Sequence, residues 1–220
     1  QQELLNIVIV GGGATGIEVA GILSEMKKFV LPNDYPDMPS SLMHIYLIEA
    51  GPRLLAGMSE ESSVHAEQFL REMGVNILLN KRVVDYRDHK VVLEDGTEIA
   101  TRTFIWVSGV TGVTIGNLDA SLIGRGGRIK VDSFNRVEGM NNVFAIGDQC
   151  IQLADENYPN GHPQLAQVAI QQGELLAKNL IRMEKGQEMK PFHYRNLGSM
   201  ATVGRNRAVA EFSKVKMQGW

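Results

Sequence analysis

The chain has 220 residues, of which 44% are hydrophobic and 21% are charged, as in an ordinary soluble protein with one large domain or two small ones. This composition excludes a disordered tail and a coiled coil, and a net charge of −3 argues against a nucleic-acid partner, which requires a basic surface. The single cysteine, Cys150, excludes a disulfide framework or a redox cysteine pair within the chain. No apolar run approaches the roughly 20 residues of a membrane-spanning helix, and the five histidines show no metal-binding spacing.

The chain opens with a short apolar run followed at once by glycines. Leu4–Val10 predicts a β-strand, and Gly11–Gly16 predicts a turn that leads into a helix. Two prolines, Pro32 and Pro36, are expected to end this helix. Its predicted sheet-facing side chains are Val19, Ile22, Leu23 and Met26.

The same alternation of strand and helix continues to residue 79. His44–Glu49 predicts a second strand, and Val75–Leu79 predicts a third. Between them Ser59 is a helix N-cap candidate, and Gly74 is expected to stop that helix. A strand–helix–strand–helix–strand order is typical of a parallel sheet with right-handed crossovers, so the predicted fold class is α/β and Rossmann-like.

A different pattern follows the third strand. Val83–Tyr86, Val91–Leu93 and Glu98–Ala100 are short strands, and Asp95-Gly96 is a hairpin turn, which together predict an inserted three-stranded meander. Phe104–Val107 then predicts a return to a buried strand of the main sheet.

The second half has fewer regular elements. Gly124–Arg128 is interpreted as a solvated turn before a strand at Ile129–Val131, and Val143–Ile146 predicts a further strand that ends in Gly147-Asp148. A helix is expected to start at Pro163, and Met200–Glu211 fits either a strand or a helix. The predicted apolar side chains of that helix are Leu165, Ala169, Leu176 and Leu180.

The pattern Gly11-x-Gly13-x-x-Gly16 carries the clearest chemistry in the chain. It follows a predicted strand and opens a predicted helix, which is the context of a dinucleotide-binding turn. Gly11 allows the tight turn, Gly13 lets the backbone approach a pyrophosphate, and Gly16 lets helix and strand pack closely. A pyrophosphate there would meet the N–H groups of the helix start, although a glycine turn without a ligand is the alternative.

Glu49 ends the second predicted strand, 33 residues after Gly16. Its carboxylate can accept hydrogen bonds from both ribose hydroxyls of an adenosine and would repel a 2′-phosphate. We therefore expect NADH to be preferred over NADPH. The spacing exceeds the usual value of about 20 residues, and we attribute the excess to the Lys27–Met43 segment.

Five stretches of the chain resemble a known family. Gly11–Gly21, Leu47–Leu55, Asn142–Asp148, Ala166–Gly173 and Gly198–Arg205 are similar to flavoprotein reductases with two dinucleotide-binding domains. Within this group the chain most resembles the type II, non-proton-pumping NADH:quinone oxidoreductases of respiratory chains. The resemblance implies a pyridine nucleotide-disulfide oxidoreductase-like fold, with NADH and FAD as cofactors and a quinone as electron acceptor.

The resemblance also implies roles for individual residues. Gly147 and Asp148 would meet the flavin, and the helix start at Ala166 and Gln167 would face the flavin ring, with Gln167 offering its amide to a quinone. For Gln167 and Gln171 a plain polar helix residue is the alternative reading. Glu18 and Gly109 would lie along the nicotinamide half of NADH, with a first-turn glutamate and a loop glycine as the alternatives. The predicted cofactor-binding set is Gly11, Gly12, Gly13, Ala14, Thr15, Gly16, Glu49, Gly109, Gly147, Asp148, Ala166 and Gln167.

The resemblance implies three regions: an NADH-binding domain at 1–109, the later part of an FAD-binding domain at 110–182 and the start of a C-terminal region at 183–220. The family carries an earlier FAD fingerprint and a membrane-associating end, and neither is present here. We therefore expect a soluble and inactive fragment that lacks FAD as purified and self-associates, or forms a homodimer, through exposed apolar surface. The intact enzyme would bind peripherally to the cytoplasmic face of a bacterial inner membrane.

Two other functions remain open at this stage. A disulfide or ferredoxin reductase of the same superfamily would share the nucleotide turn, and the disulfide type would need a cysteine pair upstream of Gln1. A non-catalytic NADH-binding module would bind the nucleotide but never carry flavin.

Overall fold

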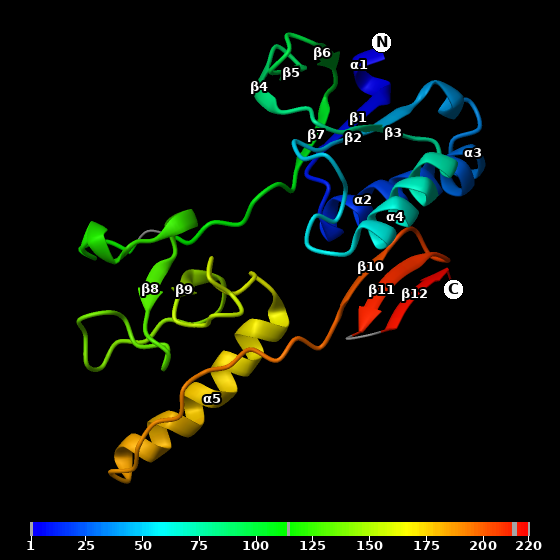
Figure 1. Ribbon diagram of the computed structural model, residues 1–220. Helices are drawn as coiled ribbons and strands as arrows, with labels where there is room; N and C mark the ends of the chain where they lie inside the picture. Colours follow the sequence, from blue (N-terminus) through cyan, green and yellow to red (C-terminus); the bar gives the residue numbers. More distant parts are fainter. Residues whose placement is uncertain (1, 114, 213–214, 220) are drawn as a thin grey trace. The chain divides into compact units, whose positions relative to one another are not determined.

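The computed structural model describes residues 2–113, 115–212 and 215–219, and the chain divides into two units (Figure 1). Unit 1 comprises Gln1–Gly109 and Gly198–Trp220, and unit 2 comprises Val110–Leu197. The division after residue 109 coincides with a predicted boundary. The predicted C-terminal region is split, because residues 183–197 group with unit 2 and residues 198–220 group with unit 1.

Unit 1 is built on a four-stranded parallel sheet with the strand order β3-β2-β1-β7. The short helix α1 precedes β1, and helices α2 and α4 connect β1 to β2 and β2 to β3 (Figure 1). This sheet and its helices confirm the predicted α/β class. The elements are α1 Gln2–Leu5, β1 Asn6–Val10, α2 Ala14–Glu25, α3 Leu31–Asp34, β2 His44–Ile48, α4 Glu60–Glu72, β3 Val75–Leu78 and β7 Thr103–Trp106.

The two faces of the sheet are covered by different layers. Alternate residues of β1 point to opposite sides, so Ile7 and Ile9 join the core beneath α2 and α4, whereas Val8 and Val10 pack against the meander. The meander is the predicted antiparallel one, and Gly96 takes the positive φ of +85° at its second turn. Its strands are β4 Val83–Arg87, β5 Lys90–Leu93 and β6 Glu98–Ala100.

A small antiparallel sheet, with the order β10-β11-β12, completes unit 1. The segment Met200–Glu211, which the sequence left open, is therefore largely strand. The bounds are β10 Ser199–Thr202, β11 Ala208–Phe212 and β12 Val215–Gly219. Ala201 and Val209 are buried in the same core as α2 and α4. Residues from the two ends of the chain thus share one hydrophobic core.

Three predictions for unit 1 are wrong in detail, although the predicted strands β1 and β7 and the first long helix are present. β1 begins at Asn6, where pairing with His44 begins, and α1 precedes it. Of the two prolines expected to end the first long helix, Pro36 lies just beyond the last helical residue, Asp34. Pro32 does not end the helix, because a π-helical turn at Met26–Val30 leads into α3, where Pro32 occupies the first turn and needs no N–H partner. Phe104–Val107 was expected to be buried, yet β7 is an edge strand whose ends are exposed.

The predicted buried face of α2 is also partly wrong. Ile22 and Met26 are 55% and 40% exposed, whereas Ile17 and Ala20 are fully buried. Gly21 explains why α2 buries a different side from the predicted one. A Cβ on Gly21 would lie 2.4 Å from the backbone nitrogen of Gly204, so the helix approaches the β10–β11 loop on its glycine side. The close backbone approach at Gly21, rather than the size of the apolar side chains, therefore decides which side of α2 is buried.

Unit 2 contains a two-stranded parallel sheet and one long helix. β8 Ile129–Val131 pairs with β9 Cys150–Gln152, and α5 spans Ala166–Glu184. The predicted strand at Val143–Ile146 is wrong, because Phe144 makes only an isolated bridge to Arg136 and the strand forms beyond Gly147-Asp148 instead.

Helix α5 differs from the prediction in its start and its buried face. It begins at Ala166 rather than Pro163, and Leu165 is the N-cap residue. Leu165 and Leu180 are exposed, whereas Gln172 and Asn179 are buried. These two amides turn inward because they bond to backbone groups, Gln172 to Gly147 and Asn179 to Lys190.

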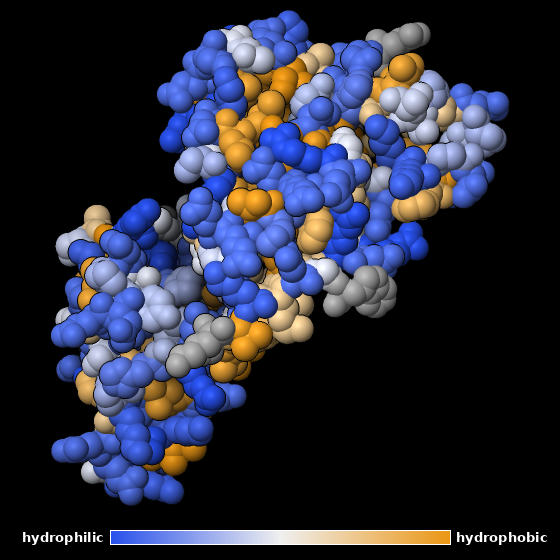
Figure 2. All heavy atoms as spheres, turned by 45° about the vertical axis from the view of Figure 1, so that its right-hand side comes forward, coloured by the Kyte–Doolittle hydropathy of each residue, from blue (hydrophilic) through white to orange (hydrophobic). Residues whose placement is uncertain are grey.

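Two surface features bear on the predicted behaviour of the chain. Apolar side chains reach the surface in patches among polar ones (Figure 2). Val113, Ile170 and Leu197 are among the exposed large apolar residues. Over the residues that the structure describes, no helix has both the length and the apolar character needed to cross a bilayer.

The start of α4 shows how the small C-terminal sheet supports the main one. Ser59 is the N-cap residue, as predicted, and its hydroxyl accepts a hydrogen bond from the Ser62 N–H. Glu211 of β11 adds a second cap from far along the chain, because one carboxylate oxygen accepts from the Ser59 N–H at 2.9 Å and from the Ser62 hydroxyl at 2.6 Å. Partial burial raises the pKa of Glu211, but the bonds from Ser59 and Ser62 outweigh it and the pKa is lowered.

We expect Glu211→Ala to lower the free energy of unfolding by about 1–2 kcal/mol at pH 7, because the helix start loses charge-assisted hydrogen bonds. Because the pKa of Glu211 is lowered in the folded chain, its full contribution to stability is present at pH values above the ordinary glutamate pKa of about 4.3. The contribution is lost as the pH falls through the folded-state pKa. Urea unfolding at pH 7 and pH 3 checks this. The deficit should shrink at pH 3, and Glu211→Gln, which keeps an acceptor, should lose less. An equal deficit at both pH values would contradict the charge argument.

Candidate functional site: a glycine turn and a flavin-type motif

The glycine turn in unit 1 is closed by backbone contacts that leave no room for side chains. Gly11 has a φ of +116°, and a Cβ there would lie 2.9 Å from the Ser108 nitrogen. A Cβ on Gly16 would lie 1.9 Å from the Gly11 carbonyl oxygen. Helix α2 therefore packs directly onto the turn that precedes it, which is the packing that the sequence predicts for Gly16.

Gly13 lies in the opposite environment. It is exposed, and a Cβ built on it would meet no protein atom within 4 Å. It is also the N-cap residue of α2 and has no side chain to cap the helix. The first turn, with Ala14 and Thr15 exposed, therefore has no side-chain cap, and its N–H groups are of the kind that bind an anion such as a pyrophosphate.

Glu49 joins the turn to the end of β2. One carboxylate oxygen accepts from the Gly12 N–H at 2.6 Å, and the other accepts from the Gly51 N–H at 2.6 Å. Each oxygen keeps a lone pair that can accept from a ribose hydroxyl. The sequence predicted the ribose-binding role, but it did not reveal that the same carboxylate holds the turn in shape.

Glu18 and Gly109 also belong to unit 1. Glu18 is half-buried, and one of its carboxylate oxygens accepts from the Thr202 hydroxyl of β10 at 3.4 Å. Gly109 is exposed and has a φ of +79°, which favours glycine. The roles that the resemblance implies for these two residues stay predictions.

In unit 2 the Gly147-Asp148 motif forms a short 3₁₀ turn packed on α5. Gly147 has a φ of +66°, and a Cβ there would lie 3.2 Å from the Ala169 Cβ. Asp148 is exposed, and its carbonyl oxygen accepts from Gln164 at 3.1 Å. The motif therefore presents a carboxylate at the surface beside the start of α5, whose N-cap residue makes no side-chain hydrogen bond to the helix.

Gln172 is a supporting residue that sequence reasoning missed. Its side-chain oxygen accepts from the Gly147 N–H at 2.7 Å and lies 3.7 Å from the Cys150 sulfur. We expect Gln172→Met to lower the free energy of unfolding by about 1–3 kcal/mol, because the Gly147 N–H would lose its partner in a buried site. Thermal unfolding checks this against Gln187→Met, which changes an exposed glutamine in the same unit. Equal midpoints for the two variants would contradict the role of Gln172.

Gln167 and Gln171 of α5 lie against the segment that follows the helix. The Gln167 side-chain oxygen accepts from the Leu197 N–H at 3.0 Å. Gln171 pairs with the backbone of Arg195 in both directions, at 3.0 Å and 2.9 Å. Both side chains thus hold residues 195–197 along the helix, and the predicted contact of Gln167 with a quinone stays a prediction.

The prediction that Arg128 belongs to a solvated turn is wrong. The side chain is buried, and its guanidinium donates to the carbonyl oxygens of Cys150 and His162. It therefore joins β9 to the segment before α5. Burial lowers its pKa and outweighs the opposite effects of Cys150 and Asp148.

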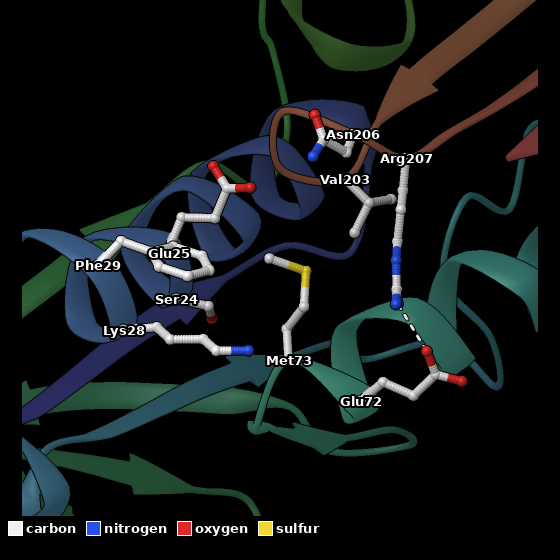
Figure 3. A pocket seen from close by; sticks show the side chains of 9 residues that line it. All are labelled: Ser24, Glu25, Lys28, Phe29, Glu72, Met73, Val203, Asn206 and Arg207. Carbon is white, nitrogen blue, oxygen red and sulfur yellow. Dashed lines mark hydrogen bonds and ion pairs between the residues drawn. The ribbon is translucent and has the colours of Figure 1, made fainter. Parts of the chain in front are cut away.

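A cavity of about 220 Å³ lies elsewhere in unit 1, between the end of α2, the end of α4 and the β10–β11 loop (Figure 3). Glu72 forms an ion pair with Arg207 there, and Phe29, Met73 and Val203 supply apolar walls. None of the predicted site residues lines this cavity.

Comparison with known proteins places the chain in a family. The family model described as pyridine nucleotide-disulphide oxidoreductase matches residues 1–173. A type II NADH:quinone oxidoreductase of Mycobacterium tuberculosis is 33% identical, and the match covers 100% of this chain and 48% of that protein. An internal alternative NAD(P)H-ubiquinone oxidoreductase of Arabidopsis thaliana is also 33% identical, with 98% and 44% covered. The chain spans about half the length of these relatives.

A solved structure of NDH2 from Plasmodium falciparum in complex with NADH has the same fold. Its TM-score is 0.85 at 19% identity, and the match covers 100% of this chain and 60% of that one. A ferredoxin reductase from Rhodopseudomonas palustris gives a TM-score of 0.68 at 17% identity, with 95% and 48% covered. The resemblance drawn from the sequence motifs is thereby confirmed. The chain belongs to the pyridine nucleotide-disulphide oxidoreductase family.

Proposed function

We propose that this chain supplies the NADH-binding unit and part of the FAD-binding unit of an enzyme that passes electrons from NADH to a quinone. The observation that carries the proposal is the turn in unit 1, where Gly13 is open to a ligand and Glu49 stands beside it with both oxygens held by backbone N–H groups. The relatives from Mycobacterium tuberculosis and Haemophilus influenzae are named NADH:quinone oxidoreductases, which supports the same reaction here.

In this proposal the turn holds the pyrophosphate of NADH. The backbone at Gly13, Ala14 and Thr15 offers uncapped N–H groups at the positive end of α2. Glu49 accepts from the adenosine ribose, and its negative charge disfavours a 2′-phosphate at the same place. Glu18 and Gly109 bind along the nicotinamide half.

Unit 2 has hydrogen-bonding groups that suit a flavin. Asp148 presents an exposed carboxylate that can accept from a ribityl hydroxyl, and the uncapped start of α5 offers positive N–H groups near Ala166 and Gln167. FAD held there would supply a ring that can accept a hydride and give up two electrons. Gln167 then orients the quinone by donating to its carbonyl oxygen.

The location and the partners of the complete enzyme belong to the same proposal. Quinones dissolve in membranes, so we place the working enzyme at a membrane surface, on the cytoplasmic face in a bacterium. The exposed apolar side chains of the chain support the proposal that it self-associates or forms a homodimer.

The direct experiment uses the full-length protein that contains this chain. NADH should bleach the flavin absorbance near 450 nm, and a water-soluble quinone should restore it over many turnovers. NADPH should act much more slowly. Flavin that NADH cannot reduce, or reduced flavin that reacts with a disulfide or ferredoxin but with no quinone, would overturn the proposal.

A further inference from the structure

The loop between β2 and α4 contacts the glycine turn but has no role in the function proposed so far. Leu55 of this loop donates its N–H to the Gly12 carbonyl oxygen at 2.8 Å. On the other side of the same residue, Glu49 accepts from the Gly12 N–H at 2.6 Å. A Cβ on Gly12 would lie 2.7 Å from Leu54 Cδ2 and 3.0 Å from Glu49 Cβ. Both backbone polar groups of the buried Gly12 are therefore held by residues 49–55.

The bond from Leu55 sets the direction of the next N–H group, which belongs to Gly13. The peptide bond between Gly12 and Gly13 is trans, so its carbonyl and its N–H lie in one plane and point in opposite directions. Because the carbonyl points toward Leu55, the Gly13 N–H points away from the loop. Within the described parts of unit 1 this N–H has no protein acceptor, and Gly13 is exposed. The Gly13 N–H is therefore directed to receive an oxygen of a ligand.

A peptide between two glycines needs such a restraint. Neither Gly12 nor Gly13 has a Cβ, and glycine reaches both signs of φ, so this peptide can rotate more easily than one between larger residues. Rotation would turn the carbonyl oxygen toward a bound phosphate, and the negative charges of the two groups would repel each other. The Leu55 N–H opposes this rotation because it holds the carbonyl on the protein side.

Leu55 itself is held in a conformation that leucine rarely adopts. Its φ is +47°, in the left-handed region, where the Cβ crowds the backbone. The residue is 4% exposed, and its carbonyl oxygen accepts from the Met58 N–H at 2.8 Å. A conformation of this kind persists only where the surrounding structure holds it. The position of the Leu55 N–H therefore depends on contacts elsewhere in the loop.

Arg53 makes those contacts. Its guanidinium donates to the carbonyl oxygens of Ala56 at 2.9 Å, Met58 at 2.8 Å and Ser59 at 3.2 Å. Ser59 is the N-cap residue of α4, so the guanidinium joins the loop to the start of that helix. A planar fork with several N–H donors suits three neighbouring carbonyls, whereas the single ammonium of a lysine does not reproduce this arrangement.

We propose that Arg53 is a positioning residue for NADH, acting through Leu55 on the peptide between Gly12 and Gly13. This inference rests on the proposed function and deepens it, because it identifies what prepares the pyrophosphate site. Arg53 holds the loop, the loop holds Leu55 in its left-handed conformation, and the Leu55 N–H keeps the Gly13 N–H directed at the pyrophosphate. Without Arg53 only a fraction of the molecules has this peptide in the binding orientation, and the apparent affinity falls by that fraction.

The test measures NADH binding and turnover in the full-length protein. Arg53→Met keeps the side-chain stem but removes the donors. We expect the Kd and KM for NADH to rise roughly tenfold or more, with kcat at saturating NADH unchanged, since the nucleotide once bound meets the same flavin. ADP-ribose, which carries the pyrophosphate without the nicotinamide, should lose affinity by the same factor. Arg87→Met removes the same charge from an exposed arginine of the meander and is the matched control, expected to bind NADH as the wild type does.

A variant that keeps the charge separates geometry from electrostatics. Arg53→Lys retains the positive charge but loses the planar fork, and we expect it to bind NADH roughly threefold or more weakly than the wild type. Full affinity in Arg53→Lys would assign the effect to charge and overturn the inference. The same variant decides the question if Arg53→Met does not fold.

Hydrogen exchange gives a readout that does not depend on a ligand. The Leu55 N–H should be protected in the wild type and should exchange roughly tenfold faster in the folded Arg53 variants, with exchange in β1 unchanged. Unchanged exchange at Leu55, wild-type NADH affinity in Arg53→Met, or a loss of kcat with no change in KM would overturn the inference. Wild-type protein that does not bind NADH would instead overturn the proposed function.

Discussion

NADH binding by Gly13→Ala is expected to be at least tenfold weaker than by the wild type, with a loss of at most about 1 kcal/mol in folding stability at this N-cap position. A Cβ at this position meets no protein atom within 4 Å, so the folded chain accommodates it. The methyl group instead occupies the space through which a pyrophosphate approaches the helix start, and it separates the ligand from the N–H groups beside it. Calorimetric titration of the full-length protein with NADH, together with thermal unfolding, checks both halves of this prediction.

Gly16→Ala is the matched comparison, because the same added methyl group meets the Gly11 carbonyl oxygen at 1.9 Å. This overlap must displace α2 or the turn, and we expect a loss of about 2–3 kcal/mol in stability together with the loss of NADH binding. Equal stability losses in the two variants, or full NADH affinity in Gly13→Ala, would show that the turn does not receive the nucleotide in the proposed way.

The second large effect concerns the choice of nucleotide. We expect Glu49→Gln to raise the NADPH-to-NADH ratio of kcat/KM by roughly tenfold to a hundredfold, because the negative charge facing a 2′-phosphate disappears. NADH itself should also bind less well. The amide keeps a single acceptor for the two N–H groups of Gly12 and Gly51, and its NH₂ group must face one of them.

Steady-state rates with both nucleotides at low ionic strength measure this ratio. Glu94→Gln is a suitable control, because it removes the same charge at an exposed position in the meander turn. A ratio that changes equally in both variants would assign the effect to net charge rather than to the site.

Features that depend on short stretches of sequence could be predicted. The glycine turn, the Ser59 cap and the meander with its Asp95-Gly96 turn each follow from neighbouring residues, and the structure contains all three. The half of the candidate site that is proposed to bind the nucleotide is similarly local, since Gly11–Gly16 form one turn and Glu49 directly follows the adjacent strand β2.

The features that could not be predicted depend on partners far apart in the chain. Glu211 bonds to Ser59, the N-cap residue of α4, 152 residues before it, and Gln172 bonds to Gly147 across 25 residues. The local sequence predicts a surface position for Arg128, because it does not reveal the bond to His162, 34 residues away. In each case a polar side chain is buried because of a backbone group that no local pattern specifies.

A crystal structure of the full-length protein with bound NADH would test the central claim most directly. We predict that a pyrophosphate oxygen accepts hydrogen bonds from backbone N–H groups between Gly13 and Thr15, and that the adenosine ribose donates to Glu49. NADH bound at any other place, with the glycine turn left open to solvent, would contradict the account.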